Sequence, residues 1–261
     1  MTLTLYQVDA FAEQVFTGNP AAIVPLAAWL PDAVMQSIAE ENNLAETAFF
    51  VPQHDGFHLR WFTPAAEVDL CGHATLASAF VLYDLLGYTA PQIRFHTRSG
   101  VLVVEKQGSD LQMTFPATMP QPCTAPAELA AALGATPARV LSAFDYVAVF
   151  DTEEEIRQLQ PDFNAMQKLG LRGVIATAPG READFVSRFF APNLRINEDP
   201  VTGSAHCELA PYWAAQLGQT RLTAQQLSPR GGSLICEVRG DRVLLIGKAI
   251  LYMTAEITIP G

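Results

Sequence analysis

Short stretches in which hydrophobic and polar residues alternate recur along the chain, and a period of two is typical of strands that bury one face. Each stretch is bounded by glycine, proline or other turn-forming residues. The clearest are residues 3–11, 58–63 and 93–97, with a hairpin over residues 101–115. The pattern therefore predicts a protein rich in β-structure.

Two longer segments, residues 72–86 and 203–217, predict helices of about four turns. Both begin on a glycine, and both stop before a second glycine, Gly87 or Gly218, which suits the left-handed position that ends a helix. The first segment is apolar around nearly its whole circumference, as expected for a helix wrapped by a sheet.

The chain also contains an internal repeat, because four stretches of the first half match four of the second in the same order. The offset between them drifts in one direction from 127 to 132, and 15 of the 41 aligned positions are identical. The matched pairs are residues 44–52 with 171–179, 60–64 with 188–192, 72–87 with 203–218, and 98–108 with 230–240. Matches that stay in register over a whole chain indicate duplication.

The seam between the copies is predicted in residues 115–126, where four prolines in twelve residues favour an extended connection. We therefore expect an N-terminal half over residues 1–117 and a C-terminal half over 118–261, with a last strand that can cross back to the first half. The fold class is α+β, each half being a curved, mostly antiparallel sheet around one central helix, and the site is expected between the halves.

Charge and composition narrow the function. The net charge of −11 argues against nucleic acid and anionic membranes as partners. Residues 1–12 lack the features of a signal peptide, and no stretch reaches the roughly 18 apolar residues of a membrane helix. The four cysteines are widely spaced, without a CxxC pair, so neither a disulfide framework nor a zinc ribbon is indicated. The sequence favours a cytoplasmic protein.

The glycines that open the two helices, Gly72 and Gly203, are candidates for binding a carboxylate. A helix start presents free backbone N–H groups and the positive end of the helix dipole. Two equivalent starts could hold a carboxylate without any arginine or metal. The alternative is that each glycine only relieves crowding.

Differences between the copies point to chemistry. Glu46 aligns with Gly173, and a carboxylate among apolar neighbours would be desolvated, as a general acid/base working near neutral pH requires. The alternative is a turn carboxylate that faces solvent.

The helix starts differ as well. Cys71 and His73 align with Thr202 and Ser204, and Asp199 lies shortly before the second helix start. His73 can donate or shuttle a proton, and Asp199 can orient it or hold a substrate ammonium group. An inert buried thiol and a helix N-cap are the alternatives for Cys71 and Asp199. The other histidines lack metal-ligand spacing, so no metal site is predicted, and no nucleotide-binding or GxSxG motif is present.

The chain resembles the phenazine-biosynthesis (PhzF-like) isomerase family, which has the diaminopimelate epimerase fold of two similar halves. The matching stretches lie in both halves: VDAF at residues 8–11, GNPAA at 18–22, AETAF at 45–49, residues 62–64, CGHAT at 71–75 and EDPVTGSA at 198–205. The resemblance implies that Glu46 is the general acid/base and that His73, Asp199 and Ser204 surround the substrate. It implies that Asn19 and the backbone at Gly72 and Gly203 bind substrate polar groups. It also implies a homodimer that needs no cofactor.

The implied reaction removes a proton from an activated carbon of a small carboxylate-bearing metabolite and returns it at another carbon. One carboxylate, Glu46, can serve both steps. Related racemases have a cysteine at each helix start, and the Cys71/Thr202 pair is similar to that of hydroxyproline dehydratases, so a dehydratase or epimerase using Cys71 is the first alternative. A non-catalytic metabolite-binding protein is the second. Nothing in the sequence identifies the substrate or ties it to phenazine synthesis.

Overall fold

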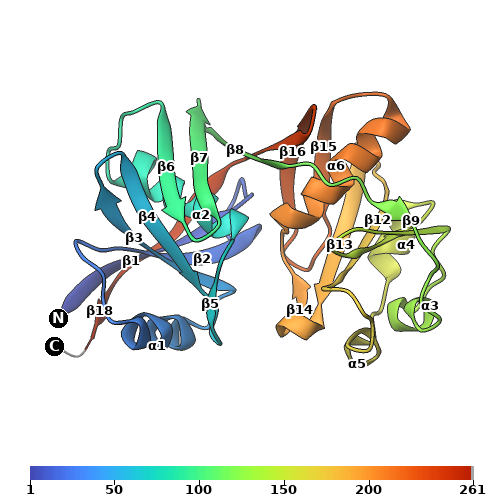
Figure 1. Cartoon of the computed structure of the whole chain (residues 1–261), viewed down its shortest axis with the longest axis horizontal. Coiled ribbons are helices and arrows are strands. Elements are labelled where there is room, and N and C mark those ends of the chain that lie inside the picture. Colours follow the sequence, from blue (N-terminus) through green and yellow to red (C-terminus); the bar gives the residue numbers. More distant parts are fainter. Residues whose placement is uncertain (260–261) are drawn as a thin grey trace. The chain divides into compact units, whose positions relative to one another are not determined.

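A computed structural model describes residues 1–259 of the chain and divides it into two compact units (Figure 1). The first comprises Met1–Thr114 together with the residues from Ile246 on, and the second comprises Phe115–Leu245. The boundary lies at the start of the proline-rich segment, and the C-terminal strand belongs to the first unit because it pairs with the N-terminal strand.

The first unit is a mixed sheet in which β18 pairs with β1, β1 with β2, and the pairing continues through β3, β4, β6, β7 and β8. The pairs β2–β3 and β4–β6 are parallel and the others are antiparallel. The strands are β1 (Thr2–Ala10), β2 (Asn19–Pro25), β3 (Glu46–Gln53), β4 (Gly56–Phe62), β5 (Glu67–Val68), β6 (Gln92–Thr97), β7 (Gly100–Gln107), β8 (Asp110–Pro116) and β18 (Ala249–Thr258). The helices are α1 (Asp32–Asn42), α2 (Gly72–Phe80) and the π-helical turn η1 (Val81–Leu85).

The second unit repeats this topology. Its parallel pairs β11–β12 and β13–β15 correspond to β2–β3 and β4–β6 of the first unit. The strands are β9 (Gln121–Pro122), β10 (Arg139–Ser142), β11 (Tyr146–Val149), β12 (Val174–Pro179), β13 (Phe185–Ala191), β14 (Ile196–Asp199), β15 (Arg221–Gln226), β16 (Gly232–Arg239) and β17 (Arg242–Gly247). The helices are α3 (Leu129–Leu133), α4 (Glu153–Gln158), α5 (Phe163–Met166), the 3₁₀ turn η2 (Pro192–Leu194) and α6 (Gly203–Leu217).

An arginine–glutamate pair at equivalent places shows that the repetition extends to side chains. Arg60 on β4 forms a two-pronged ion pair with Glu67 on β5, and its guanidinium lies over the ring of Phe62. Arg188 on β13 makes the same pair with Glu198 on β14. Each pair ties a short strand to its neighbour, directly before the long helix of its unit.

The two long helices pack as their sequences predict. In α2 every side chain from His73 to Ala79 is buried, and the helix contacts β1, β2 and β3. The α6 helix ends at Leu217, and Gly218 takes the left-handed conformation with φ of +69°. The first helix departs from the prediction, because regular α-helix stops at Phe80 and one π turn follows, with Leu86 N–H bonded to Val81 O. Gly87 then has φ of +71°, so the helical segment as a whole ends where expected.

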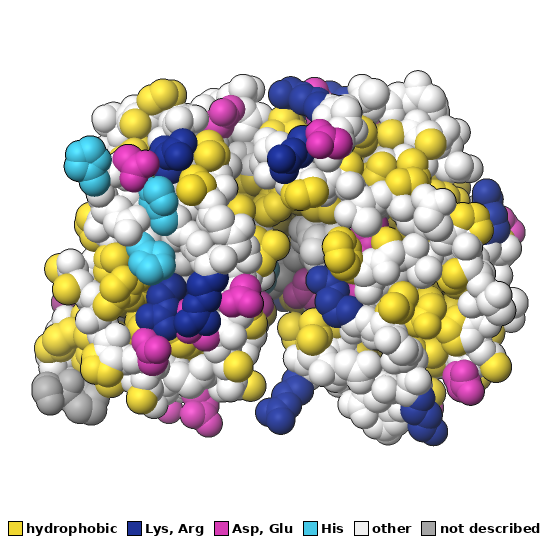
Figure 2. All heavy atoms as spheres, in the orientation of Figure 1, with side chains coloured by type: hydrophobic (Ala, Val, Ile, Leu, Met, Phe, Trp, Pro, Cys, Tyr) yellow, Lys and Arg dark blue, Asp and Glu magenta, His cyan; other side chains and the backbone are white. Residues whose placement is uncertain are grey.

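The surface of each unit mixes charges of both signs. On the face drawn in Figure 2, basic and acidic side chains lie beside one another. Many are paired, as are Arg98 with Glu67 in the first unit and Arg221 with Glu237 in the second. None of the helices within residues 1–259 combines the length and apolar character needed to cross a membrane.

Candidate active site

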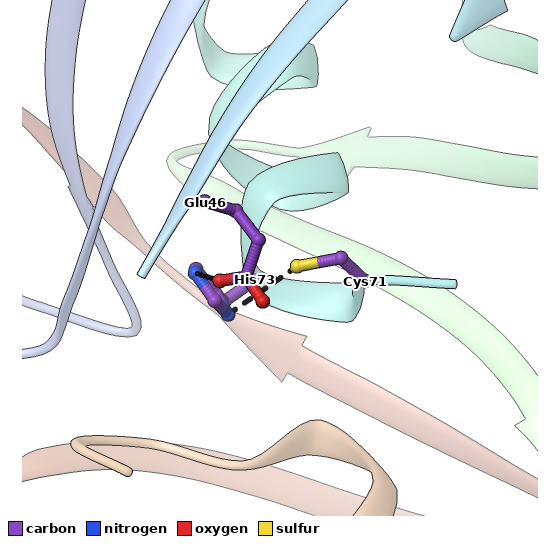
Figure 3. Close-up of side chains that lie close together, drawn as sticks. All are labelled: Glu46, Cys71 and His73. Carbon is purple, nitrogen blue, oxygen red and sulfur yellow. Dashed lines mark hydrogen bonds and ion pairs between the residues drawn. The ribbon is translucent and has the colours of Figure 1, made fainter. Parts of the chain in front are cut away.

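Glu46 is the first residue of β3, a strand paired with β2 on one side and β4 on the other. Its place in the sheet interior explains its burial, since only 8% of the residue is exposed. The alternative of a turn carboxylate facing solvent is therefore wrong. From this first position of β3, the Glu46 side chain points toward the start of α2 (Figure 3).

His73 lies in the first turn of α2 and is in contact with three polar side chains. Its Nε2 is 3.0 Å from Glu46 Oε2, and its Nδ1 is 3.2 Å from Asn19 Nδ2 and 3.5 Å from Cys71 Sγ. Figure 3 shows Glu46 and Cys71 approaching the imidazole ring from two sides. Asn19 and Cys71 therefore contact the Nδ1 side of the ring, and Nε2 faces the Glu46 carboxylate.

Burial and charge act on the imidazole in opposite directions. Burial opposes a positive charge on His73, but the contact with Cys71 Sγ and the Glu46 carboxylate outweigh it, so the pKa of His73 is raised well above its ordinary value. Burial also raises the pKa of the Cys71 thiol, and the charge of Glu46 raises it further. The site therefore favours a protonated imidazole beside the Glu46 carboxylate and a thiol in its neutral form.

The same three side chains lie close enough together that they could hold a metal ion, which the sequence spacing did not reveal. One ligand atom each from Glu46, Cys71 and His73 lies within 4.8 Å of the others, and all three residues are buried. They come from β3 and from the start of α2, so a search for local metal-binding motifs such as HExxH could not detect them. An ion held there would compete with the proton between His73 and Glu46.

In the second unit the equivalent helix start holds a fixed carboxylate. Asp199 is the last residue of β14, and its Oδ2 accepts a hydrogen bond from the hydroxyl of Thr202, the N-cap residue of α6. Asp199 is thus not the N-cap that the sequence offered as an alternative. Gln226, on β15, hydrogen-bonds both residues.

An arginine that the sequence analysis missed reaches the start of α6. Arg172 Nη2 donates to Ser204 Oγ at 3.1 Å, while its guanidinium forms a two-pronged ion pair with Asp145, which is fully buried. An arginine at this helix start was not anticipated from the sequence. The available signal was its position, because Arg172 stands directly before Gly173, the counterpart of Glu46.

The backbone around Gly173 leaves little space for a side chain. A Cβ at this position would lie 2.7 Å from Phe190 O and 2.8 Å from the ring of Phe189. The second unit could therefore carry a carboxylate at this place, where the first unit carries Glu46, only if its backbone shifted. At Gly203, by contrast, a Cβ would come no closer than 3.4 Å to Leu245, so crowding does not account for that glycine.

Comparisons with known proteins identify the family of the chain. A protein-family profile described as phenazine biosynthesis-like protein (PhzC-PhzF) matches residues 8–255. A relative called an uncharacterized isomerase, from Pseudomonas aeruginosa, is 56% identical over 98% of this chain and 99% of its own length. A crystal structure of a PhzF family protein from Enterococcus faecalis is 49% identical, covers 99% of this chain and 100% of that chain, and superposes with a TM-score of 0.97.

A more distant structure bears on the fold alone. A hydroxyproline epimerase from Agrobacterium vitis is 10% identical, covers 98% of this chain and 91% of its own, and has a TM-score of 0.59. The predicted α+β, epimerase-like fold is therefore confirmed.

Proposed function

Because the chain belongs to the phenazine biosynthesis-like (PhzF) family, we propose that it is an isomerase that moves a proton within a small carboxylate-bearing metabolite, needs no cofactor, and uses Glu46 as the proton carrier. The observation that carries the proposal is the buried contact of 3.0 Å between Glu46 Oε2 and His73 Nε2. A general acid/base must lie within reach of the proton it moves, and its environment sets its protonation state.

The reaction requires two proton transfers at one carboxyl group. Glu46 takes a proton from an activated carbon, and the electron pair left behind is delocalised over the conjugated part of the substrate. The protonated Glu46 then returns the proton to another carbon of the same system, so that the product differs from the substrate only in the position of one hydrogen. His73 Nε2, 3.0 Å from Glu46 Oε2, is placed to stabilise the carboxylate while the proton is absent, and Asn19 contacts the other nitrogen of the ring.

The asymmetry between the units supports a single base. Inversion of one carbon centre needs a base on each face of the substrate. The second unit has Thr202 in place of a second cysteine and has little space for a carboxylate at Gly173. The raised pKa of the Cys71 thiol weighs against the dehydratase alternative, in which that residue would have to act as a thiolate.

Residues of the second unit are proposed to bind the substrate. Asp199 supplies a hydrogen-bond acceptor, and the Ser204 hydroxyl, which already accepts from Arg172, can donate its own proton to a substrate oxygen. This division of roles is what the family resemblance implies for these two residues.

The test is solvent deuterium incorporation, followed by ¹H NMR in D₂O with a panel of small unsaturated amino and hydroxy acids. We expect Glu46→Gln to lower incorporation by about 100-fold or more, the usual contribution of a general acid/base, while ligand-induced thermal stabilisation persists. The control is Glu41→Gln on α1, which is exposed and should exchange at the wild-type rate. Wild-type incorporation by Glu46→Gln would refute the proposal, and binding by the wild type with neither incorporation nor a rearranged product would indicate a metabolite-binding protein.

A further inference from the structure

Thr202 occupies the place in the second unit that Cys71 occupies in the first, and its hydroxyl lies between two buried polar groups. Gln226 Nε2 is 3.1 Å from Thr202 Oγ1, and on the other side Thr202 Oγ1 contacts Asp199 Oδ2. Gln226 is 1% exposed, Thr202 7% and Asp199 8%, so these contacts form in the protein interior. Each hydrogen bond here has little competition from water.

The backbone fixes which end of the Gln226 amide faces Thr202. Gln226 Oε1 accepts from the Thr202 backbone N–H at 2.9 Å, and Gln226 Nε2 donates to the Asp199 carbonyl at 2.6 Å. Turning the amide over would set an oxygen against a carbonyl and an NH₂ group against an N–H. The NH₂ end therefore faces the Thr202 hydroxyl.

This orientation determines the direction of the next hydrogen bond. An NH₂ group can only donate, so Thr202 Oγ1 accepts from Gln226, and its single proton is left to donate to Asp199 Oδ2. An oxygen that accepts this bond is best satisfied as part of an ionised carboxylate.

We infer that Thr202 and Gln226 are positioning residues that hold Asp199 ionised and fixed in place, so that Asp199 meets the substrate as a hydrogen-bond acceptor and never as a proton donor. The inference rests on the proposed function for the role of Asp199 toward substrate, but the relay itself does not depend on it. The relay also explains the exchange of cysteine for threonine between the units. A hydroxyl is a much stronger donor than a thiol, so it suits a helix start that holds an anion, whereas Cys71 lies beside a protonatable imidazole.

Other groups around Asp199 are consistent with this role. Arg172 lies within electrostatic reach of Asp199, and its positive charge favours the ionised form. His206 donates from Nδ1 to the Thr202 carbonyl at 2.8 Å, and burial lowers the pKa of His206 to about 4, so it is uncharged near neutral pH. Glu198, next to Asp199 in sequence, is paired with Arg188.

The experiment follows the protonation of Asp199 without any substrate. The full-length protein is labelled with [4-¹³C]aspartate, the Asp199 signal is assigned by its loss in Asp199→Asn, and its ¹³C shift is followed from pH 8 to pH 3. Thr202→Val removes the hydroxyl at nearly constant volume. We expect its Asp199 signal to begin changing at least one pH unit higher than in the wild type, which is a tenfold or larger change in the ionisation equilibrium. Thr202→Ser, which keeps the hydroxyl, should follow the wild type.

A second variant guards against a local disturbance by the new methyl group. Thr202→Ala removes the hydroxyl without adding an atom and should displace the Asp199 titration in the same direction. Titrations of Thr202→Val and Thr202→Ala that coincide with the wild type would overturn the inference. Because the titration needs no turnover, its result is independent of the Glu46→Gln experiment, and a failure of either can be recognised separately.

Discussion

Glu208 offers a quantitative test of the electrostatics of the second unit. Its side chain is fully buried on α6, near Asp145, which is also fully buried and is paired with Arg172. Burial raises the pKa of the Glu208 carboxyl, the charge of Asp145 raises it further, and Arg172 offsets these effects only in part, so the pKa reaches about 8. The folded protein therefore keeps Glu208 protonated at neutral pH.

The consequence for stability has a definite sign. The unfolded chain releases this proton near pH 4.5, whereas the folded protein retains it up to about pH 8. Between these values folding requires the uptake of a proton, so the free energy of unfolding falls as the pH rises. At about 1.4 kcal/mol per pH unit, the loss is at most about 5 kcal/mol by pH 8. Glu208→Gln removes the titrating group and should remove this loss.

The assay is urea-induced unfolding, followed by circular dichroism and tryptophan fluorescence, at intervals between pH 5 and pH 8. We expect Glu208→Gln to be similar to the wild type in stability near pH 5 and more stable by several kcal/mol at pH 8. The matched control is Glu182→Gln, an exposed residue of the same unit, which should change stability little at any pH. A difference between Glu208→Gln and the wild type that is the same at pH 5 and pH 8 would refute the reasoning.

Two further predictions concern packing and thiol reactivity. Gly173→Ala should lower the free energy of unfolding by about 1–3 kcal/mol, because its Cβ would lie 2.7 Å from the Phe190 carbonyl oxygen. Gly170→Ala is the control and should change stability little, because the nearest neighbour of its Cβ lies at 3.8 Å, so equal melting temperatures of the two variants would contradict the prediction. Iodoacetamide at pH 7 should label the partly exposed Cys123 well before Cys71, because burial raises the pKa of the Cys71 thiol. Peptide mass spectrometry measures the two labelling rates. Faster labelling of Cys71 than of Cys123 would show that Cys71 is a reactive thiolate.

The elements of the fold could be predicted largely from local pattern. Alternating residues gave strands close to their observed bounds, and the glycines after the long helices marked where the helical segments end. The π turn at Val81–Leu85 could not be predicted, because its sequence is as compatible with a regular α-helix. The return of β18 to β1 was an open possibility in the sequence, since pairing between the two ends of a chain depends on the whole fold.

The candidate site was predictable where the two copies differ and not where distant residues meet. Comparing the copies singled out Glu46 and His73, which the structure places 3.0 Å apart. Arg172, Gln226 and Glu208 were missed. Each of them interacts with a side chain that is distant in the sequence, and neither periodicity nor a short motif predicts such a contact.

Because the fold is duplicated, residues that serve folding can be separated from residues that serve chemistry by comparing the two units. The Arg60–Glu67 and Arg188–Glu198 pairs are the same in both units, and they hold equivalent short strands. At the adjacent helix start the units diverge, because one surrounds an imidazole with groups that favour its proton and the other directs donors at Asp199. If the positions around the helix start served only packing, they would be expected to repeat as the ion pairs do. Their divergence leaves a protonatable imidazole at one helix start and a fixed carboxylate at the equivalent place in the other unit, as the proposed one-base proton transfer would use them.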